Sequence, residues 1–247
     1  MRGLTKLAWS EFRLTLRDPM TTFWSLAFPA LWFLLMVVVI GMPIPGFDYH
    51  GQGFASLVFP ASISLVILST SFIGVPIALT AYREAGVLRR LRVTPVRVTT
   101  LVAAYSLSQL AFTVVGVAVV TVLAMGFFEV RILGSVLAFV GVLVCAMVMF
   151  LALGSAIGSV ARTTRTANII IWSAFTPMLM LSELFMPLSL LPEWLQPIAK
   201  ALPLTPVNTL LRDIVFGVPL HDPWRFGVLG AWAVVSLVLT VRFFRWE

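Results

Sequence analysis

The densest concentration of arginine in the sequence is the stretch AYREAGVLRRLRVTPVRVTTL, residues 81–101, which lies between two long apolar runs. It holds five arginines and one acid, Glu84. The spacing favours a short amphipathic helix over residues 82–92, although Gly86 costs such a helix about 1 kcal/mol relative to alanine. Pro95 then ends it, because proline disfavours helical backbone in the preceding residue. The apolar side of this helix can face the membrane or a partner. The alternative is a plain basic loop, which would not require Glu84 or the helical spacing.

Residues suited to catalysis are few and scattered. Lys6 and Lys200 are the only lysines, and neither lies in the G-x-x-x-x-G-K-[ST] loop that binds nucleotide phosphates. His50 and His221 fall in predicted loops, and Cys145 stands alone in an apolar run, which excludes a disulfide or a cysteine-rich metal site. The sequence therefore gives little support to the alternative of an intramembrane enzyme. We expect no cofactor in this chain.

A few polar residues within or beside the apolar runs are candidates for a transport path. Glu183 lies near the end of the fifth run, and Arg212 follows in the next polar segment. We expect both at the outer exit of the path, where Glu183 pairs with Arg212 or attracts cations; the alternative is an interfacial acid that points outward. Gln109 and Asn168 are further candidates for the path, although hydrogen bonds between helices explain them as well.

The composition places these residues in a membrane protein. The 247 residues are 60% hydrophobic and only 11% charged, whereas soluble domains carry about 25% charged residues. Lipid must therefore be the main solvent of a chain that has the length of one domain. The net charge of +7 does not indicate nucleic-acid binding, because the charge is confined to short segments between apolar runs.

Six apolar runs are each near or above the roughly 20 residues that cross a bilayer as a helix. None shows the period-2 alternation of a β-barrel strand, so the sequence predicts an all-α protein with six transmembrane helices. Prolines inside the first two runs predict kinks. The runs lie at about 20–42, 54–80, 98–128, 132–160, 166–187 and 225–244.

Two further segments have amphipathic character. Residues 1–19 mix apolar and basic positions and predict a helix on the membrane surface, ended by Asp18-Pro19; an ordinary basic flank of the first span is the alternative. Residues 188–218 contain too many prolines for one span and predict two short helices, at about 192–201 and 206–216, that re-enter the membrane or lie at its outer surface. An ordinary surface loop is the alternative for this segment.

The basic residues predict the orientation. Thirteen of the 17 lysines and arginines fall in the N-terminal segment, in 81–97, in 161–165 and near the C-terminus, which six spans place on one side. The positive-inside rule assigns that side, with both termini, to the cytoplasm. We expect a multi-pass protein of a bacterial-type plasma membrane.

Two motifs resemble those of ABC-2 type exporter permeases. The charged segment is similar to the cytoplasmic coupling helix of these permeases, which contacts the ATP-binding subunit, and the matching residues are Glu84, Gly86, Leu88, Arg89, Arg90, Leu91, Thr94 and Pro95. The stretch LFMPLSLLPEWLQPIAKALPLTPVNTLLRDIVFG is similar to their extracytoplasmic segment between spans five and six. Glu183 and Pro206 depart from the small and aromatic residues common there. The resemblance covers the whole chain.

This resemblance implies a half-transporter driven by a separate ABC ATP-binding protein, which would bind ATP and Mg²⁺. Two permeases, identical or related, and two ATP-binding subunits would form the working unit within the bilayer, with no nucleic acid involved. The apolar spans favour a hydrophobic drug-like or lipid-like substrate, as in multidrug resistance. The alternatives are a permease for a polysaccharide or glycolipid and a non-catalytic assembly or channel subunit.

Overall fold

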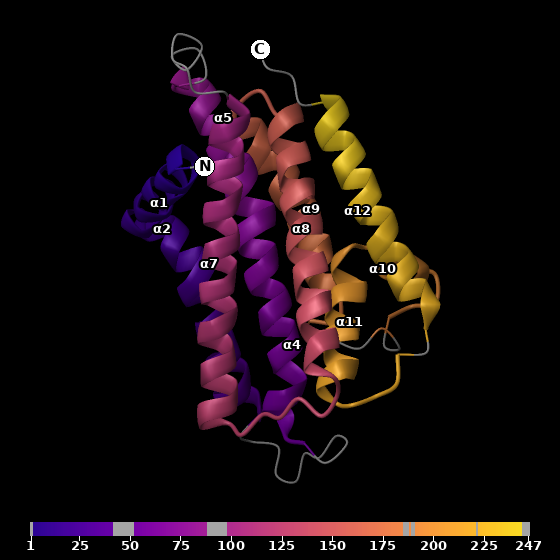
Figure 1. Cartoon of the computed structure of the whole chain (residues 1–247). Coiled ribbons are helices and arrows are strands. Elements are labelled where there is room, and N and C mark those ends of the chain that lie inside the picture. Colours follow the sequence, from indigo (N-terminus) through magenta and orange to yellow (C-terminus); the bar gives the residue numbers. More distant parts are fainter. Residues whose placement is uncertain are drawn as a thin grey trace.

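The computed structural model describes residues 2–41, 52–87, 98–184, 188, 191–220 and 222–243, which form a bundle of helices joined by turns (Figure 1). The all-α prediction is confirmed for these residues. In chain order the elements are α1 (Arg2–Arg17), α2 (Pro19–Thr22), the π-helical η1 (Phe23–Ala27), α3 (Phe28–Leu35), η2 (Met36–Gly41), α4 (Phe54–Ile67), η3 (Leu68–Gly74), α5 (Val75–Glu84), α7 (Val98–Phe127), α8 (Val136–Val160), α9 (Thr164–Leu181), α10 (Gln196–Ala201), α11 (Leu204–Val215) and α12 (Pro223–Phe243).

Five helices of the described chain are long and apolar enough to cross a membrane. The remaining predicted run, the fifth, corresponds to α9, which is less apolar because Arg165 and Asn168 lie near its start. This helix ends at Leu181 and gives way to a turn, so the predicted extent of 166–187 is too long; residues 185–187 lie outside the described part. The five long helices are Phe23–Gly41, Phe54–Glu84, Thr100–Phe127, Val136–Val160 and Pro223–Thr240.

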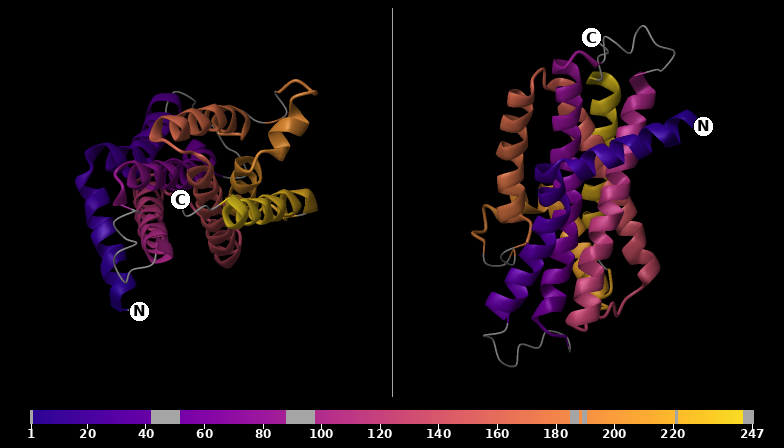
Figure 2. Two further views of the ribbon diagram at one scale, coloured as in Figure 1. Left: turned by 90° about the horizontal axis from the view of Figure 1, so that it is seen from above. Right: turned by 90° about the vertical axis from the view of Figure 1, so that its left-hand side faces the viewer.

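The N-terminal helix α1 lies across the bundle instead of along it (Figure 2). It packs mainly on α7, where the rings of Phe12 and Phe112 have centroids 4.7 Å apart. The basic side chains Arg13 and Arg17 are exposed. The amphipathic pattern therefore corresponds to a helix with one packed and one charged face, and it ends directly before Asp18-Pro19, as the sequence predicts.

The second long helix, α4–η3–α5, is the centre of the bundle. In the most apolar 18-residue stretch of this helix 83% is buried within the protein, compared with 11% in the corresponding stretch of α12. Helix α12 therefore lies at the periphery. Two glycines let α8 approach this central helix. A Cβ at Gly154 would overlap the carbonyl oxygen of Ser71, and a Cβ at Gly158 would lie 2.9 Å from a methyl carbon of Leu79. Small residues four apart bring membrane helices into backbone contact in this way.

The charged segment begins with a helix end that the sequence did not predict. Helix α5 stops at Glu84, where the N–H of Ala85 donates to the Ala81 carbonyl at 2.9 Å and that of Gly86 donates to the Arg83 carbonyl at 3.1 Å. Gly86 has φ of +66°, a left-handed conformation that glycine adopts without steric cost. The prediction of a continuous helix over residues 82–92 is therefore wrong at Ala85 and Gly86, where the chain forms a turn.

The remainder of the predicted coupling helix, including Leu88, Arg89, Arg90, Leu91 and Thr94, lies outside the described residues. Of the charged segment, residues 81–101, the structure therefore describes residues 81–87 and the last four, which begin α7.

The proline-rich segment forms two short helices, α10 and α11, close to the ranges predicted. Helix α11 is buried along most of its length against α4 and α8. Near its end, the Val215 and Ile214 carbonyls accept hydrogen bonds of 3.0 and 2.9 Å from the N–H groups of Leu133 and Gly134. This helix therefore packs on protein. The alternative of an ordinary surface loop is wrong for this segment.

Candidate functional site

We call the end of the bundle that holds α1, the end of α5, the α8–α9 turn and the end of α12 the basic end (Figure 1). Basic residues gather there: those with described side chains are Lys6, Arg13, Arg17, Arg83, Arg162, Arg165 and Arg242. At or toward the opposite end the described basic residues are Arg131, Lys200, Arg212 and Arg225. The fold thus keeps the charge asymmetry of the sequence.

Side-chain hydrogen bonds join the start of the charged segment to the α8–α9 turn. An Nη of Arg83 donates to the Ala161 carbonyl, which caps the end of α8, at 2.5 Å. The Glu84 carboxylate accepts from the backbone N–H of Thr164 at 2.9 Å and from its hydroxyl at 2.6 Å, at the first residue of α9. A cation thus lies at a helix C-terminus and an anion at a helix N-terminus, where each helix dipole favours it. Glu84, predicted to face an ATP-binding partner, has an internal partner here.

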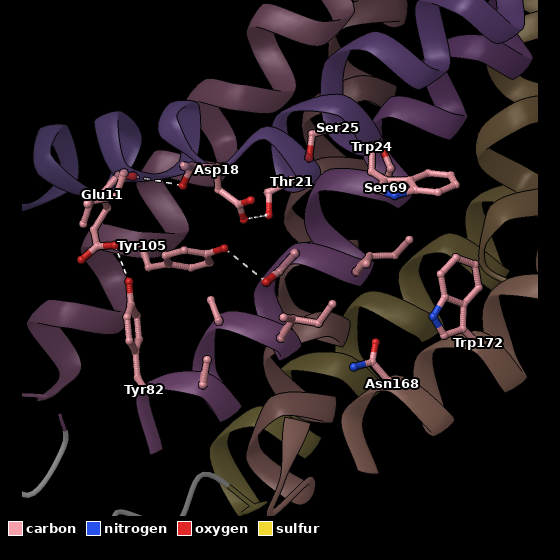
Figure 3. Close-up of a pocket in the computed structure, with 17 residues that line it drawn as sticks. Glu11, Asp18, Thr21, Trp24, Ser25, Ser69, Tyr82, Tyr105, Asn168 and Trp172 are labelled. Atoms are coloured by element: carbon pink, nitrogen blue, oxygen red, sulfur yellow. Dashed lines mark hydrogen bonds between the residues drawn. The ribbon is translucent and has the colours of Figure 1, made fainter. Parts of the chain in front are cut away.

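Beside these hydrogen bonds lies a chamber of about 550 Å³ (Figure 3). It is partly open and is bordered by the N-terminal elements α1 to η1, by η3 and α5, by α7 and by α9. The size suits a drug-sized molecule. The lining residues are Glu11, Leu14, Thr15, Asp18, Thr21, Trp24, Ser25, Ser69, Ile73, Gly74, Ile77, Ala78, Ala81, Tyr82, Tyr105, Asn168 and Trp172.

Polar groups line one side of the chamber in a connected set. The hydroxyl of Tyr82 donates to the carboxylate of Glu11, and the hydroxyl of Tyr105 donates to the Gly74 carbonyl at 3.2 Å. Behind Tyr105, the buried Gln109 amide donates to the same hydroxyl at 2.6 Å. Gly74 is the last residue of η3, whose π-helical turns lie directly before Val75-Pro76. The irregular helix is thus held in place by residues of α7.

Aromatic rings line much of the rest. Trp24 and Trp172 meet edge to face across the chamber with centroids 6.4 Å apart, and Tyr82 and Tyr105 do so at 6.1 Å. Asn168 lies near Trp172, and its amide donates to a carbonyl of its own helix at 3.0 Å. The lining therefore offers flat apolar faces together with a small number of polar groups.

A second polar cluster lies beyond the end of α9, away from the basic end. Glu183 pairs with Arg212, and Asp213 pairs with Arg225. Arg212 also approaches Asp213 at 3.7 Å, which joins the two pairs, and Asp222 extends the cluster 2.7 Å from Arg225. The Glu183 side chain is only 7% exposed, so its charge depends on this partner. The cluster ties α9, α11 and α12 together.

The residues predicted for the transport path do not form one site. Asn168 lines the chamber, and Gln109 supports it from behind Tyr105. Glu183 and Arg212 are together, as anticipated, but fifteen residues of mostly helical chain separate Glu183 from Asn168, roughly 20 Å at 1.5 Å per residue. The chamber and the ion-pair cluster are therefore distinct.

The sequence analysis missed most of the chamber, above all its aromatic rings. One signal was available in residues 11–18. Glu11, Leu14, Thr15 and Asp18 recur at i, i+3, i+4 and i+7, the spacing that places residues on a single helix face. Two acids on one face of an otherwise basic amphipathic helix indicate a polar surface beneath it.

The long apolar helices define a polytopic membrane protein. The sequence profile of the family described as ABC-2 type transporter matches residues 3–216, so the chain belongs to this family. The match is to the membrane permease domain, and no ATPase domain is detected in the chain. No curated protein matches the sequence significantly. Permeases of this family typically work with an ATP-binding subunit.

Proposed function

We propose that this chain is the permease subunit of an ATP-driven exporter that moves a hydrophobic drug-like or lipid-like molecule outward across a bacterial-type plasma membrane. In this proposal α9 also crosses the membrane, which brings the number of crossings to six. Helices α10 and α11 form a re-entrant pair at the outer side. The basic end, with both termini, faces the cytoplasm because basic residues are retained on that side. Two such permeases, identical or related, assemble with two ATP-binding subunits.

The observation that carries this proposal is the link between the charged segment and the chamber. Glu84 holds the first residue of α9, and one to two turns further along the same helix Asn168 and Trp172 line the chamber. A partner that binds the charged segment can therefore pull on α9 directly, and α9 moves a wall of the chamber. Short rigid-body shifts of packed helices are a common way to transmit such motion.

The cluster around Glu183 completes the proposed path. It joins the end of α9 to α11 and α12, so its ion pairs would hold the outer side closed until α9 moves. The mostly apolar and aromatic chamber favours a hydrophobic substrate over a sugar polymer, which needs a polar channel along its length. Export of a polysaccharide or glycolipid remains the second candidate.

Glu84→Ala is expected to uncouple ATP hydrolysis from transport, because it removes both hydrogen bonds to Thr164. In vesicles that contain the permease with its copurified ATP-binding subunit, substrate-stimulated ATPase activity should fall by about fivefold or more, the range of ordinary coupling energies. Basal ATPase activity should persist. Thr164→Val, which deletes one of the two bonds, should give a smaller loss.

Glu193→Ala is the matched control, since it removes an exposed acid from the other end of the bundle. Normal coupling by Glu84→Ala at wild-type expression would contradict the proposed role. Failure of the chain to copurify with any ATP-binding subunit would contradict the proposed function as a whole.

The orientation is tested by single cysteines at exposed positions in a Cys145→Ala background. Glu193→Cys should react with an impermeant thiol reagent added to intact cells, whereas Arg162→Cys should react only after the membrane is opened. The expectation follows from the retention of basic segments on the cytoplasmic side. The opposite labelling pattern would invert the topology.

A further inference from the structure

We propose that the chamber selects organic cations with an apolar body, so that this is the substrate class of the exporter. The inference deepens the proposed function and rests on it. It is carried by the placement of carboxylates and aromatic faces around a cavity of about 550 Å³.

Glu11 is the central residue. It is buried, lines the chamber, and its carboxylate accepts a hydrogen bond from the neutral hydroxyl of Tyr82 (Figure 3). The described lysines and arginines form no ion pair with it. A carboxylate in such a setting is costly unless a cation compensates its charge. A bound cation would supply that compensation.

A second carboxylate lies directly after the end of the same helix. Asp18 also lines the chamber, seven residues after Glu11, and accepts a hydrogen bond of 2.5 Å from the Thr21 hydroxyl. The described lining residues include no lysine, arginine or histidine. Two arginines near the chamber contact other groups: Arg13 lies over the Trp9 ring at 5.0 Å, and Arg83 binds the Ala161 carbonyl. The chamber thus has acidic groups in its wall, and Arg13 and Arg83 contact groups other than Glu11.

The aromatic rings supply the second half of cation recognition. Trp24, Trp172, Tyr82 and Tyr105 all border the chamber. The face of an aromatic ring attracts a cation within about 6 Å, and tryptophan does so most strongly. Between them lie the aliphatic side chains of Leu14, Ile73 and Ile77 together with small alanines, which suit an apolar body. A neutral or anionic molecule of the same shape would gain the apolar contacts but not the electrostatic ones.

Two ions of equal shape and opposite charge test the proposal. Tetraphenylphosphonium and tetraphenylborate are measured by equilibrium dialysis against the purified full chain in lipid nanodiscs, with empty discs subtracted for partition into lipid. The wild type should bind the phosphonium more tightly than the borate. Glu11→Gln keeps the acceptor for Tyr82 but removes the charge, and should weaken phosphonium binding about tenfold, with borate binding unchanged or tighter.

Matched controls remove the same groups elsewhere. Glu193→Gln and Trp194→Leu alter exposed residues outside the chamber and should leave both affinities unchanged, whereas Trp172→Leu should weaken phosphonium binding. Equal binding of the two ions by the wild type would overturn the proposal without any variant. Unchanged phosphonium affinity in folded Glu11→Gln would also overturn it. Binding is measured without the ATP-binding subunit. A negative result would therefore contradict cation recognition but not the proposed exporter function, which is tested by copurification and ATPase coupling.

The cation that the chamber binds could be a soluble molecule or the ammonium group of a lipid headgroup. The lipid composition of the discs separates these two sources. Adding phosphatidylethanolamine to phosphatidylglycerol discs weakens phosphonium binding if the lipid headgroup occupies the chamber. Unchanged affinity assigns the chamber to soluble cations. Either result supports cation recognition.

Discussion

Replacing Arg212 with methionine is expected to destabilise the folded protein by about 3–5 kcal/mol, the usual cost of breaking a buried ion pair from one side. The change leaves Glu183, whose side chain is 7% exposed, without the guanidinium that pairs with it. The backbone there is held in place, because the Glu183 carbonyl accepts a 3.1 Å hydrogen bond from the Asn208 amide. The measurement is the thermal midpoint of the purified protein in detergent.

Two companion variants separate the ion pair from general damage. Adding Glu183→Gln to Arg212→Met removes the stranded charge and should restore most of the lost stability. Arg131→Met alters an exposed arginine toward the same end of the bundle and should have little effect. If Arg212→Met is as stable as the wild type, the cluster does not hold α9 to α11.

Gly154→Val is expected to cost about 3 kcal/mol or more, at the upper limit of ordinary overpacking, because the obstacle is backbone and cannot rotate away. The new side chain would meet the Ser71 carbonyl and, at 3.3 Å, the Cβ of Val75. Helix α8 would therefore move away from the central helix. The expected result is a sharp loss of monodisperse protein in size-exclusion chromatography and a lower thermal midpoint.

Gly141→Val is the control, since residue 141 lies in the same helix and a Cβ there meets nothing within 4 Å. It should behave as the wild type does. Equal losses in the two variants would mean that valine disturbs α8 itself and that the close contact at Gly154 is unimportant.

The sequence predicted the helices well because hydropathy is a sum over neighbouring residues. A run of apolar side chains favours lipid whatever it packs against, so the ranges of the long helices could be read directly. The amphipathic helix at the N-terminus and the pairing of Glu183 with Arg212 were also within reach. The pairing follows from the cost of an isolated charge near lipid, which makes the nearest opposite charge the expected partner.

Local backbone chemistry was harder to read. Gly86 looked like a weak point within a helix, whereas the structure uses its freedom at positive φ to end one. A glycine in a helical pattern fits both outcomes, and the choice depends on whether the chain must turn there. Likewise, Gly154 and Gly158 are unremarkable in an apolar run until a second helix approaches them.

The chamber was decided by tertiary structure alone. Its wall combines residues from position 11 to position 172, and most of them, such as Trp24 or Tyr105, are ordinary in an apolar sequence. Glu84 finds its partner Thr164 eighty positions further along the chain. Hydropathy determines that each helix enters the membrane, but it contains no information about which helix lies beside which. That choice depends on close packing between distant surfaces. The sequence by itself therefore determined the helices, whereas the fold placed an acid and aromatic rings around one cavity and joined Glu84 to Thr164.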